Sequence, residues 1–184
     1  MRGIQIEVNK ADVKRVQMHL KKLEDAPKHL RNAINRTTTQ ALKSIKQGRS
    51  AGYTVKAGRF NADIRVQRAT AAHLDATIKS AGRPPTLQSF KTSAPKAGVK
   101  ADITKSGLKL IKGDAGKGAA FMMNGLPTQR RTAERHPLKV LRGNSTPIMV
   151  EKIYKGERGG QGNMEEKIRQ RLHEEMMAEI KKLM

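Results

Sequence analysis

The sequence predicts an α+β protein, with long N-terminal helices and a C-terminal helix packed on a small, mostly antiparallel sheet. Apolar stripes with helical spacing lie near both ends of the chain. Between them, short alternating segments are broken by Gly, Pro and Ser, which is typical of short strands joined by turns. The order of strand, helices, several short strands and helix therefore favours segregated helical and strand regions.

The N-terminal region predicts a short strand followed by a helix. Apolar and polar residues alternate in GIQIEV, residues 3–8, as expected of a strand with one buried face. Asn9 and Asp12 then stand three apart, close to the pattern of a helix N-terminal cap. The next apolar residues are spaced by three and four, which predicts a helix with one buried stripe: Val13, Val16, Leu20 and Leu23.

A second and longer helix is predicted over residues 26–47. Pro27 fits the first turn of a helix, Asp25 precedes it as a cap, and Gly48 supplies a stop. Residues 37–39 are three threonines, which are poor helix formers, so packing must hold this helix. Its apolar stripe consists of Leu30, Ala33, Ile34, Ala41, Leu42 and Ile45.

The middle of the chain predicts several short strands. VKAGRFNADIRVQRAT, residues 55–70, predicts a short helix that turns into a strand. Further strands are predicted within residues 73–82, 85–90, 99–107 and 108–113. AAFMM, residues 119–123, fits a strand or a helical start, and residues 124–147 are mostly loop with a candidate strand at 138–141.

The chain divides into three parts on these patterns: an α+β body over residues 1–155, a glycine-rich hinge over 156–163 and an amphipathic helix over 164–184. Asn163 and Glu166 form a capping box for this helix. The hinge suggests that the helix moves or exchanges between subunits. The residues predicted to contact a second subunit or another protein are Met164, Ile168, Leu172, Met176 and Ile180.

The chain is strongly basic and the charge is unevenly distributed. Its net charge is +22, from 38 basic and 16 acidic residues. Five acids and five bases balance in residues 164–184, whereas residues 26–62 hold eight Lys or Arg and no acid. Such a charge favours polyanions, because each neutralised phosphate releases counterions. We expect one face to meet a polyanion and another to meet protein, while an acidic protein, a membrane surface or a merely soluble basic surface remain alternatives.

The sequence predicts no enzyme, metal or cofactor. There is no cysteine, which excludes disulfides and thiolate chemistry and fits a reducing cytoplasm. The five histidines lack metal-ligand spacing, and GDAGKGAA, residues 113–120, departs from a phosphate-binding loop. Glu165, Glu166, Glu174 and Glu175 are interpreted as solvated partners of neighbouring Lys and Arg. No apolar run predicts a membrane span or a signal peptide.

Nucleic-acid binding, if present, is predicted to be diffuse contact with the phosphate backbone. Phe60, Phe90 and Phe121 are spaced about thirty residues apart, like core anchors of separate strands rather than a base-stacking cluster. No zinc-finger or RNA-recognition signature is present. The candidate DNA-facing residues are Lys56, Arg59, Arg65, Arg68, Arg130, Arg131 and Arg135.

Several segments together resemble the minor tail protein Z family of tailed bacteriophages, also called tail-completion proteins. The resemblance runs from about residue 11 to 182, and it depends on the order of the elements more than on any one motif. Its clearest elements are residues 33–36 (Ala-Ile-Asn-Arg), residues 68–70 (Arg-Ala-Thr), Phe121 after the glycine-rich turn, and residues 145–150 (Ser-Thr-Pro-Ile-Met-Val).

The resemblance implies a structural virion protein at the head-proximal end of the tail. It implies a homo-oligomeric ring, a hexamer by analogy with tail symmetry, between tail-terminator or tail-tube proteins and head-connector proteins. Genome DNA would pass through the ring or end near it, and assembly would take place in the host cytoplasm. The expected location is the neck of the virion.

Two other functions compete with this one. A nucleoid-like or ribosomal-type basic protein that binds nucleic acid without sequence preference would explain the charge, though not the order of the elements. A basic nuclease toxin would need a histidine or acidic metal centre, which the sequence does not display.

Overall fold

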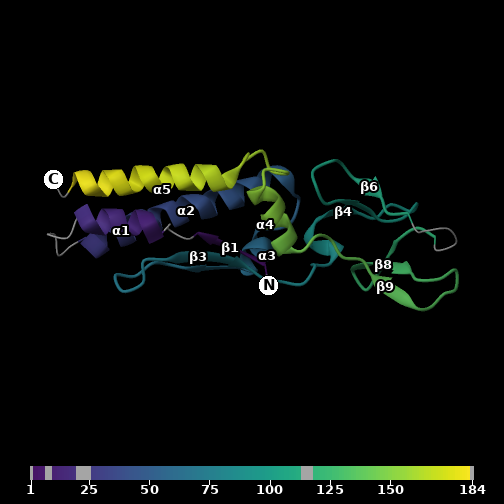
Figure 1. Ribbon diagram of the computed structural model, residues 1–184. Coiled ribbons are helices and arrows are strands. Elements are labelled where there is room, and N and C mark those ends of the chain that lie inside the picture. The colour runs from purple at the N-terminus through teal and green to yellow at the C-terminus, as the bar shows by residue number, and fades with distance from the viewer. Residues whose placement is uncertain (1, 7–9, 20–25, 113–117, 183–184) are drawn as a thin grey trace.

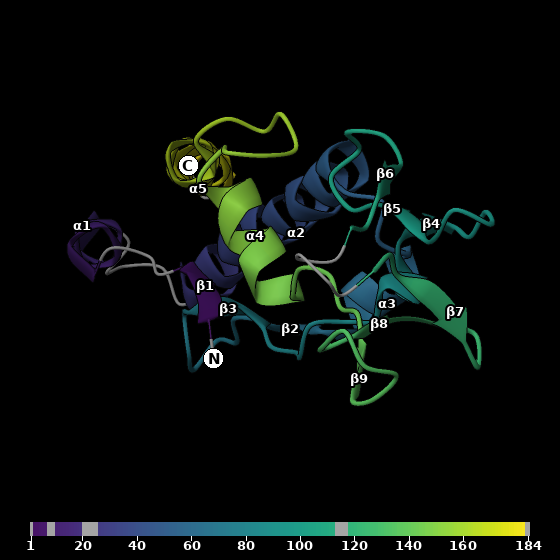
Figure 2. The same ribbon diagram turned by 90° about the vertical axis from the view of Figure 1, so that its right-hand side faces the viewer.

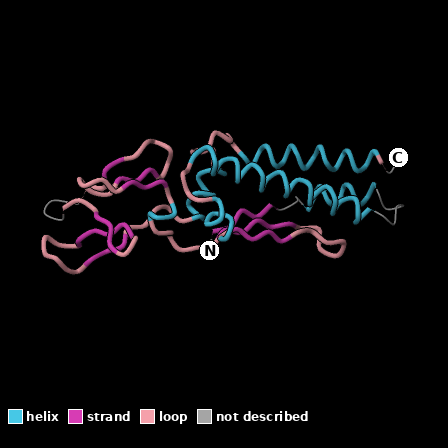
Figure 3. The backbone as a smooth tube through the Cα atoms, turned by 180° about the vertical axis from the view of Figure 1, so that it is seen from behind, coloured by secondary structure: helices cyan, strands magenta, loops and turns pink. Residues whose placement is uncertain are grey.

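Helices and a sheet form one half of the elongated molecule, and two further sheets with their loops form the other half (Figure 1 and Figure 3). The computed structural model describes residues 2–6, 10–19, 26–112 and 118–182. Its helices are α1 (Lys10–His19), α2 (Ala26–Gly52), α3 (Ala57–Ala62), α4 (Thr146–Tyr154) and α5 (Met164–Lys181), with the 3-10 turn η1 (Leu87–Ser89). The α+β class predicted from the sequence is confirmed.

The strands form three antiparallel sheets of three strands each in the described part of the chain. The first sheet, in the order β1-β3-β2, lies under the helices and contains β1 (Arg2–Ile6), β2 (Ile64–Gln67) and β3 (Ala76–Ser80). The second, in the order β4-β5-β6, contains β4 (Lys91–Ser93), β5 (Lys100–Asp102) and β6 (Lys109–Leu110). The third, in the order β7-β8-β9, contains β7 (Phe121–Met123), β8 (Leu126–Arg130) and β9 (Leu138–Val140).

Helix α2 is longer than predicted, and Gly48 does not end it. The helix continues to Gly52, and both glycines are buried. A Cβ atom on Gly52 would lie 2.9 Å from the backbone nitrogen of Gly159, and one on Gly48 would lie 2.4 Å from Cγ2 of Ile153. The two glycines, one helical turn apart, therefore let the loop before α5 and helix α4 approach the axis of α2 closely.

The three threonines of α2 are accommodated by hydrogen bonds back to the helix itself. The hydroxyl groups of Thr37, Thr38 and Thr39 donate to the carbonyl oxygens four residues earlier, at 2.8–3.0 Å. Thr37 and Thr38 are buried under neighbouring elements. Back-bonding removes the cost of burying an unpaired hydroxyl, so packing holds a segment whose intrinsic helix propensity is low.

The sequence predicts mostly loop over residues 124–147, whereas the structure has strand β8 there and helix α4 directly after Ser145. Helix α4 begins after Ser145 with a proline in its first turn, a position where proline is well tolerated. It packs against α2, α5, β1 and β3, as the end-on view shows (Figure 2). The predicted strand at 138–141 is confirmed as β9. The predicted cap at Asp25 and the apolar residues Leu20 and Leu23 lie outside the described residues.

Pro127 occupies the central strand of its sheet, where proline normally removes a ladder hydrogen bond. Its carbonyl accepts from the N–H of Leu141 at 2.8 Å, but it has no N–H to return. The carbonyl of Leu141 accepts instead from the N–H of Leu87 at 3.1 Å. Because Pro127 has no N–H, the carbonyl of Leu141 is free to accept from Leu87, and this hydrogen bond connects the buried Leu87 of η1 to the end of β9.

The main hydrophobic cluster lies where α2, α3, α4 and the sheets meet. Phe60 is fully buried there and Phe90 is 3% exposed, which confirms both as core residues. Neither lies on a strand as predicted, since Phe60 belongs to α3 and Phe90 follows η1, and Phe121 on β7 is only half-buried. Tyr53, Met149 and Ile153 are among the other large side chains of this cluster. A smaller cluster of Leu30, Ala33 and Met176 joins α2 to α5.

The hydroxyl group of Tyr53 is buried without a hydrogen-bond partner in the described part of the chain. Burial, the largest influence on this group, raises the pKa of Tyr53. We expect Tyr53→Phe to increase the free energy of unfolding by about 1 kcal/mol, because an unpaired buried polar group is removed while the ring is kept. Thermal denaturation measures this, with Tyr154→Phe as the matched change at a half-exposed tyrosine. A lower melting temperature for Tyr53→Phe would contradict the assignment.

Candidate functional site

The first group of predicted cations lies around α3 and β2. Lys56, Arg65 and Arg68 are exposed, but Arg59 is half-buried and its Nη1 lies 3.1 Å from Oδ1 of Asp63. Asp63 also accepts from the hydroxyl of Thr146 at 2.8 Å, so it connects α3 to the start of α4. Arg59 is therefore part of a structural ion pair.

The outer face of the first sheet brings two cations together directly. Arg65 on β2 and Lys79 on β3 are cross-strand partners in the antiparallel register. Both side chains are exposed, on the side of the sheet opposite the buried Ile78. Like charges directly opposite each other destabilise a sheet unless an anion lies close by. Sequence reasoning selected Arg65 and missed Lys79, because the pairing of β2 with β3 is needed to find it.

Arg68 does not share this face, because its side chain reaches α2. Its Nη1 donates to the hydroxyl of Thr39 at 3.1 Å and to the carbonyl of Asn35 at 3.4 Å. The side-chain amide of Asn35 in turn pairs with the backbone of Ala69, donating to its carbonyl and accepting from its N–H, both at 3.0 Å. Two of the segments that carry the family resemblance, residues 33–36 and 68–70, are thus in direct contact.

The second group of predicted cations lies in the other half of the molecule. Arg130 ends β8, and Arg131 and Arg135 lie in the loop that leads to β9. All three side chains are exposed, and none forms an ion pair with a carboxylate of the described residues. In Figure 1, α3 lies in the middle of the elongated molecule, whereas β8 and β9 lie in the half without the long helices, so the two groups of cations lie on different elements.

The apolar stripe of α5 packs against the same chain. Met164 is 1% exposed and Met176 is 7% exposed, while Ile168, Leu172 and Ile180 are partly buried. Met164 and Ile168 join the main cluster, and Leu172 and Met176 pack near Leu30 of α2. Four of the five, Met164, Ile168, Leu172 and Met176, thus form core contacts within one chain. The contact of the stripe with a second subunit stays a prediction.

The loop before α5 is closely packed at one point. Gly159 lies against α2, and its backbone conformation has a φ of +83°. Asn163 then caps α5, its side-chain oxygen accepting from the N–H of Glu165 at 3.1 Å. The cap at Asn163 is confirmed, although its acceptor contact goes to the residue two positions later. Hinge motion about residues 156–163 stays a prediction.

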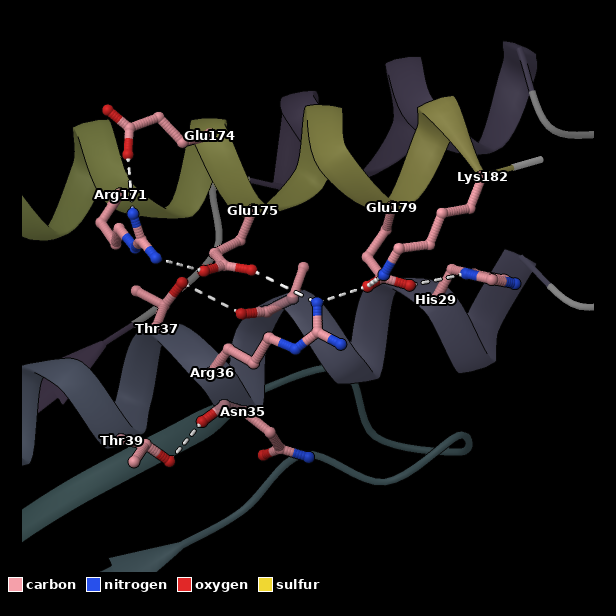
Figure 4. Close-up of polar contacts among 11 residues, drawn as sticks. His29, Asn35, Arg36, Thr37, Thr39, Arg171, Glu174, Glu175, Glu179 and Lys182 are labelled. Atoms are coloured by element: carbon pink, nitrogen blue, oxygen red, sulfur yellow. Dashed lines mark hydrogen bonds and ion pairs between the residues drawn. The ribbon is translucent and has the colours of Figure 1, made fainter. Parts of the chain in front are cut away.

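A network of buried charges joins α5 to α2 (Figure 4). Glu179 is 3% exposed, and its carboxylate lies 2.6 Å from Nη1 of Arg36 and 2.7 Å from Nδ1 of His29. Glu175 is 9% exposed and lies 2.7 Å from Nη2 of Arg171 and 3.5 Å from Nη1 of Arg36. The interpretation of Glu175 as a solvated residue is therefore wrong.

The positions of Glu175 and Glu179 in the sequence indicate that they are partly buried. Glu175 and Glu179 stand three residues after Leu172 and Met176, respectively, so they lie beside the apolar stripe of α5. Helix α2, which lacks acids, then supplies Arg36 as their partner. Glu165 and Glu174 are exposed and pair with Arg169 and Arg171 of their own helix, as predicted.

The charge of Glu179 is stabilised by its partners. Burial is the largest single influence and opposes ionisation, but hydrogen bonds from Lys182 and His29, together with the charges of Lys182 and Arg36, outweigh it. The net effect lowers the pKa of Glu179 below its ordinary value. These groups come from both helices, so the ionised carboxylate holds α5 against α2.

Stability should consequently depend on the ionisation of Glu179. A carboxyl whose pKa is lowered by folding stabilises the protein above its unfolded-state pKa, and this contribution is lost as the pH falls through the folded-state pKa. We expect the melting-temperature difference between the native chain and Glu179→Gln to be largest near pH 7 and to shrink below pH 4. Glu166→Gln, at an exposed position of the same helix, is the control. A difference that does not vary with pH would contradict this assignment.

The described residues contain neither a metal-binding cluster nor a membrane-spanning helix. No three His, Cys, Asp or Glu side chains come together there as a metal site. No helix in the same residues has the length and apolarity needed to cross a membrane. Comparisons with protein families, with curated proteins and with solved structures found no match to this chain.

Proposed function

We propose that the chain is a structural virion protein of a tailed bacteriophage, located in the neck at the head-proximal end of the tail. There it forms a homo-oligomeric ring, a hexamer by analogy with tail symmetry. The ring joins tail-terminator or tail-tube proteins to the head connector and surrounds the path of the DNA.

The observation that carries this proposal is the separation of charge over the molecule. Glu175 and Glu179 of α5 pair with Arg36 on α2, and Glu165 and Glu174 pair with bases of α5 itself. The exposed cations on the first sheet and on the loop between β8 and β9 have no carboxylate partner among the described residues. A chain of net charge +22 can form a ring only where something negative offsets the repulsion between copies.

A second support is the contact between two segments of the family resemblance. Asn35 and Ala69 join α2 to the end of β2 through two hydrogen bonds. The contact uses the side-chain amide of Asn35 and only the backbone of Ala69. The resemblance therefore includes a pair of segments that act together in the fold, rather than two unrelated short matches.

Removal of the gene from the phage that encodes the chain tests the proposal. We expect filled heads and separate tails in place of joined particles, and restoration of joined particles by the native chain supplied in trans. The variant Arg65→Glu with Lys79→Glu should complement poorly, whereas Glu166→Gln should complement fully. Normal joined particles in the absence of the chain would contradict the proposal.

The cross-strand pair of Arg65 and Lys79 also fits the alternative function, sequence-independent binding of free nucleic acid. The salt dependence of duplex DNA binding by the isolated chain separates the two functions. Tight binding of short duplexes at physiological salt would favour the alternative. Weak binding that disappears at physiological salt is expected of a ring protein that meets DNA only in the assembled particle.

A further inference from the structure

Strand β9 combines an open edge with a hollow beside it. It is an outer strand of the sheet β7-β8-β9, and it lies at the margin of the molecule with β8 on its inner side (Figure 1 and Figure 2). A hollow of about 570 Å³ runs along the strand. It is lined by Pro84, Arg131 and residues 138–143.

The backbone groups of Leu138 and Val140 face the open side of this strand. The N–H of Arg131 donates to the carbonyl of Pro137 at 3.0 Å, and the N–H of Leu141 donates to Pro127 at 2.8 Å. Hydrogen-bonded and non-hydrogen-bonded residue pairs alternate along an antiparallel pair of strands. Pro137 is bonded to Arg131, directly after β8, and Leu141 is bonded to β8, so the backbone N–H and C=O groups of Leu138 and Val140 point away from β8. Among the described residues, neither makes a backbone hydrogen bond to another element. Such an edge can accept a further strand.

The charge around the hollow decides what kind of strand fits. Arg131, Lys139 and Arg142 line it, and none forms an ion pair with a carboxylate of the described residues. Arg142 donates to the carbonyl of Pro84 at 2.9 Å, which positions its guanidinium without neutralising it. A second copy of β9 would bring the same three cations against these, so the charge opposes edge-to-edge pairing between copies.

The hollow also has an apolar lining, which a nucleic-acid backbone would not need. Pro84, Leu138, Val140 and Leu141 contribute it. An extended peptide uses all three features at once, since its backbone pairs with the edge, alternate side chains enter the hollow, and the others meet the cations. We propose that β9 binds an extended acidic segment of another protein as an added strand. This inference is independent of the proposed function and holds for a chain with any other role.

The test uses the full chain and a fluorescent ten-residue peptide of alternating Val and Glu. We expect saturable binding that Lys139→Glu weakens roughly tenfold, through reversal of one charge at the site. Lys109→Glu, at an exposed lysine on the outer strand β6, should bind as the native chain does. A peptide of alternating Val and Lys should not bind.

Two changes then test the backbone pairing itself. Val140→Pro removes an outward-facing N–H without touching the bonds to β8, and it should weaken binding roughly fivefold to tenfold. If that variant does not fold, the peptide with N-methyl groups at alternate residues removes the same class of hydrogen bond from the other partner and should fail to bind. Binding of the N-methylated peptide with unchanged affinity would overturn the proposal.

Duplex DNA of twelve base pairs separates a peptide site from a phosphate site. A phosphate site would bind this DNA and would not bind the acidic peptide. Lys139→Glu would then weaken DNA binding, whereas Val140→Pro would leave it unchanged. That combination of results would overturn the proposal. Absence of peptide binding at millimolar concentration would overturn it as well.

Discussion

Gly159→Ala is expected to lower the free energy of unfolding by about 3 kcal/mol or more. Gly159 has a φ of +83°, and a Cβ atom there would lie 2.5 Å from the carbonyl oxygen of Gly48. Both atoms in this contact are held by the backbone, so no side-chain rotation relieves it. The loop before α5 must move away from α2, which loosens the attachment of the whole terminal helix. Chemical denaturation measures the loss.

Gly160→Ala is the matched control for this prediction. Gly160 has a φ of +65°, and a Cβ atom there meets nothing within 4 Å. Gly160→Ala should therefore lower the free energy of unfolding by about 1 kcal/mol, the strain of a left-handed backbone at alanine. It creates no close contact like that between Gly159 and Gly48. Equal losses for the two variants would show that the contact between Gly159 and α2 does not limit stability.

Arg36→Met is expected to lower the free energy of unfolding by about 2 kcal/mol. Its guanidinium contacts the buried carboxylates of Glu179 and Glu175 from the opposite helix. Removal of one partner from a buried ion pair leaves a charge without compensation. The loss stays below the full value for a buried pair, because Arg36 is half exposed and Glu179 keeps His29 and Lys182.

Arg31→Met supplies the control for that change, since Arg31 lies on the same helix and its side chain bonds only Asn32 among the described residues. We expect its effect to stay within about 0.5 kcal/mol. In a double-mutant cycle, Arg36→Met should cost less in the background of Glu179→Gln than in the native chain. Strict additivity of the two changes would contradict the network.

Residue spacing along the chain is enough to predict some helices and strands of this fold, but not all of them. The spacing of Leu30, Ile34 and Ile45 is enough to identify α2, and alternation is enough for β1 and β3. Strand β8 contains Pro127, although proline is normally absent from central strands. The carbonyl of Leu141, which Pro127 cannot pair with, accepts from the N–H of Leu87 instead, and this distant partner is not visible in the local sequence. The end of α2 was misplaced for a similar reason, because Gly48 supports a close contact with segments more than a hundred residues away.

The candidate site also has features that the sequence predicts and features that it does not. Exposure of Arg65, Arg130 and Arg135 follows from their charge, since Lys and Arg side chains are rarely buried. Their spatial grouping does not, because Lys79 joins Arg65 only through the strand register. The burial of Glu179 likewise depends on Arg36, which is 143 residues distant. The position of Glu179 beside the apolar stripe of α5 can be read from the spacing, but the identity of its partner on α2 is a property of the tertiary fold.

The most direct measurement of the proposed role is a reconstruction of the particle neck at a resolution that allows this chain to be traced. The account predicts a closed ring of copies between tail and connector, with the face that carries Arg65 and Lys79 turned towards DNA or towards an acidic neighbouring ring. A chain traced outside the neck, or present there as a single copy with those two cations facing solvent, would contradict it.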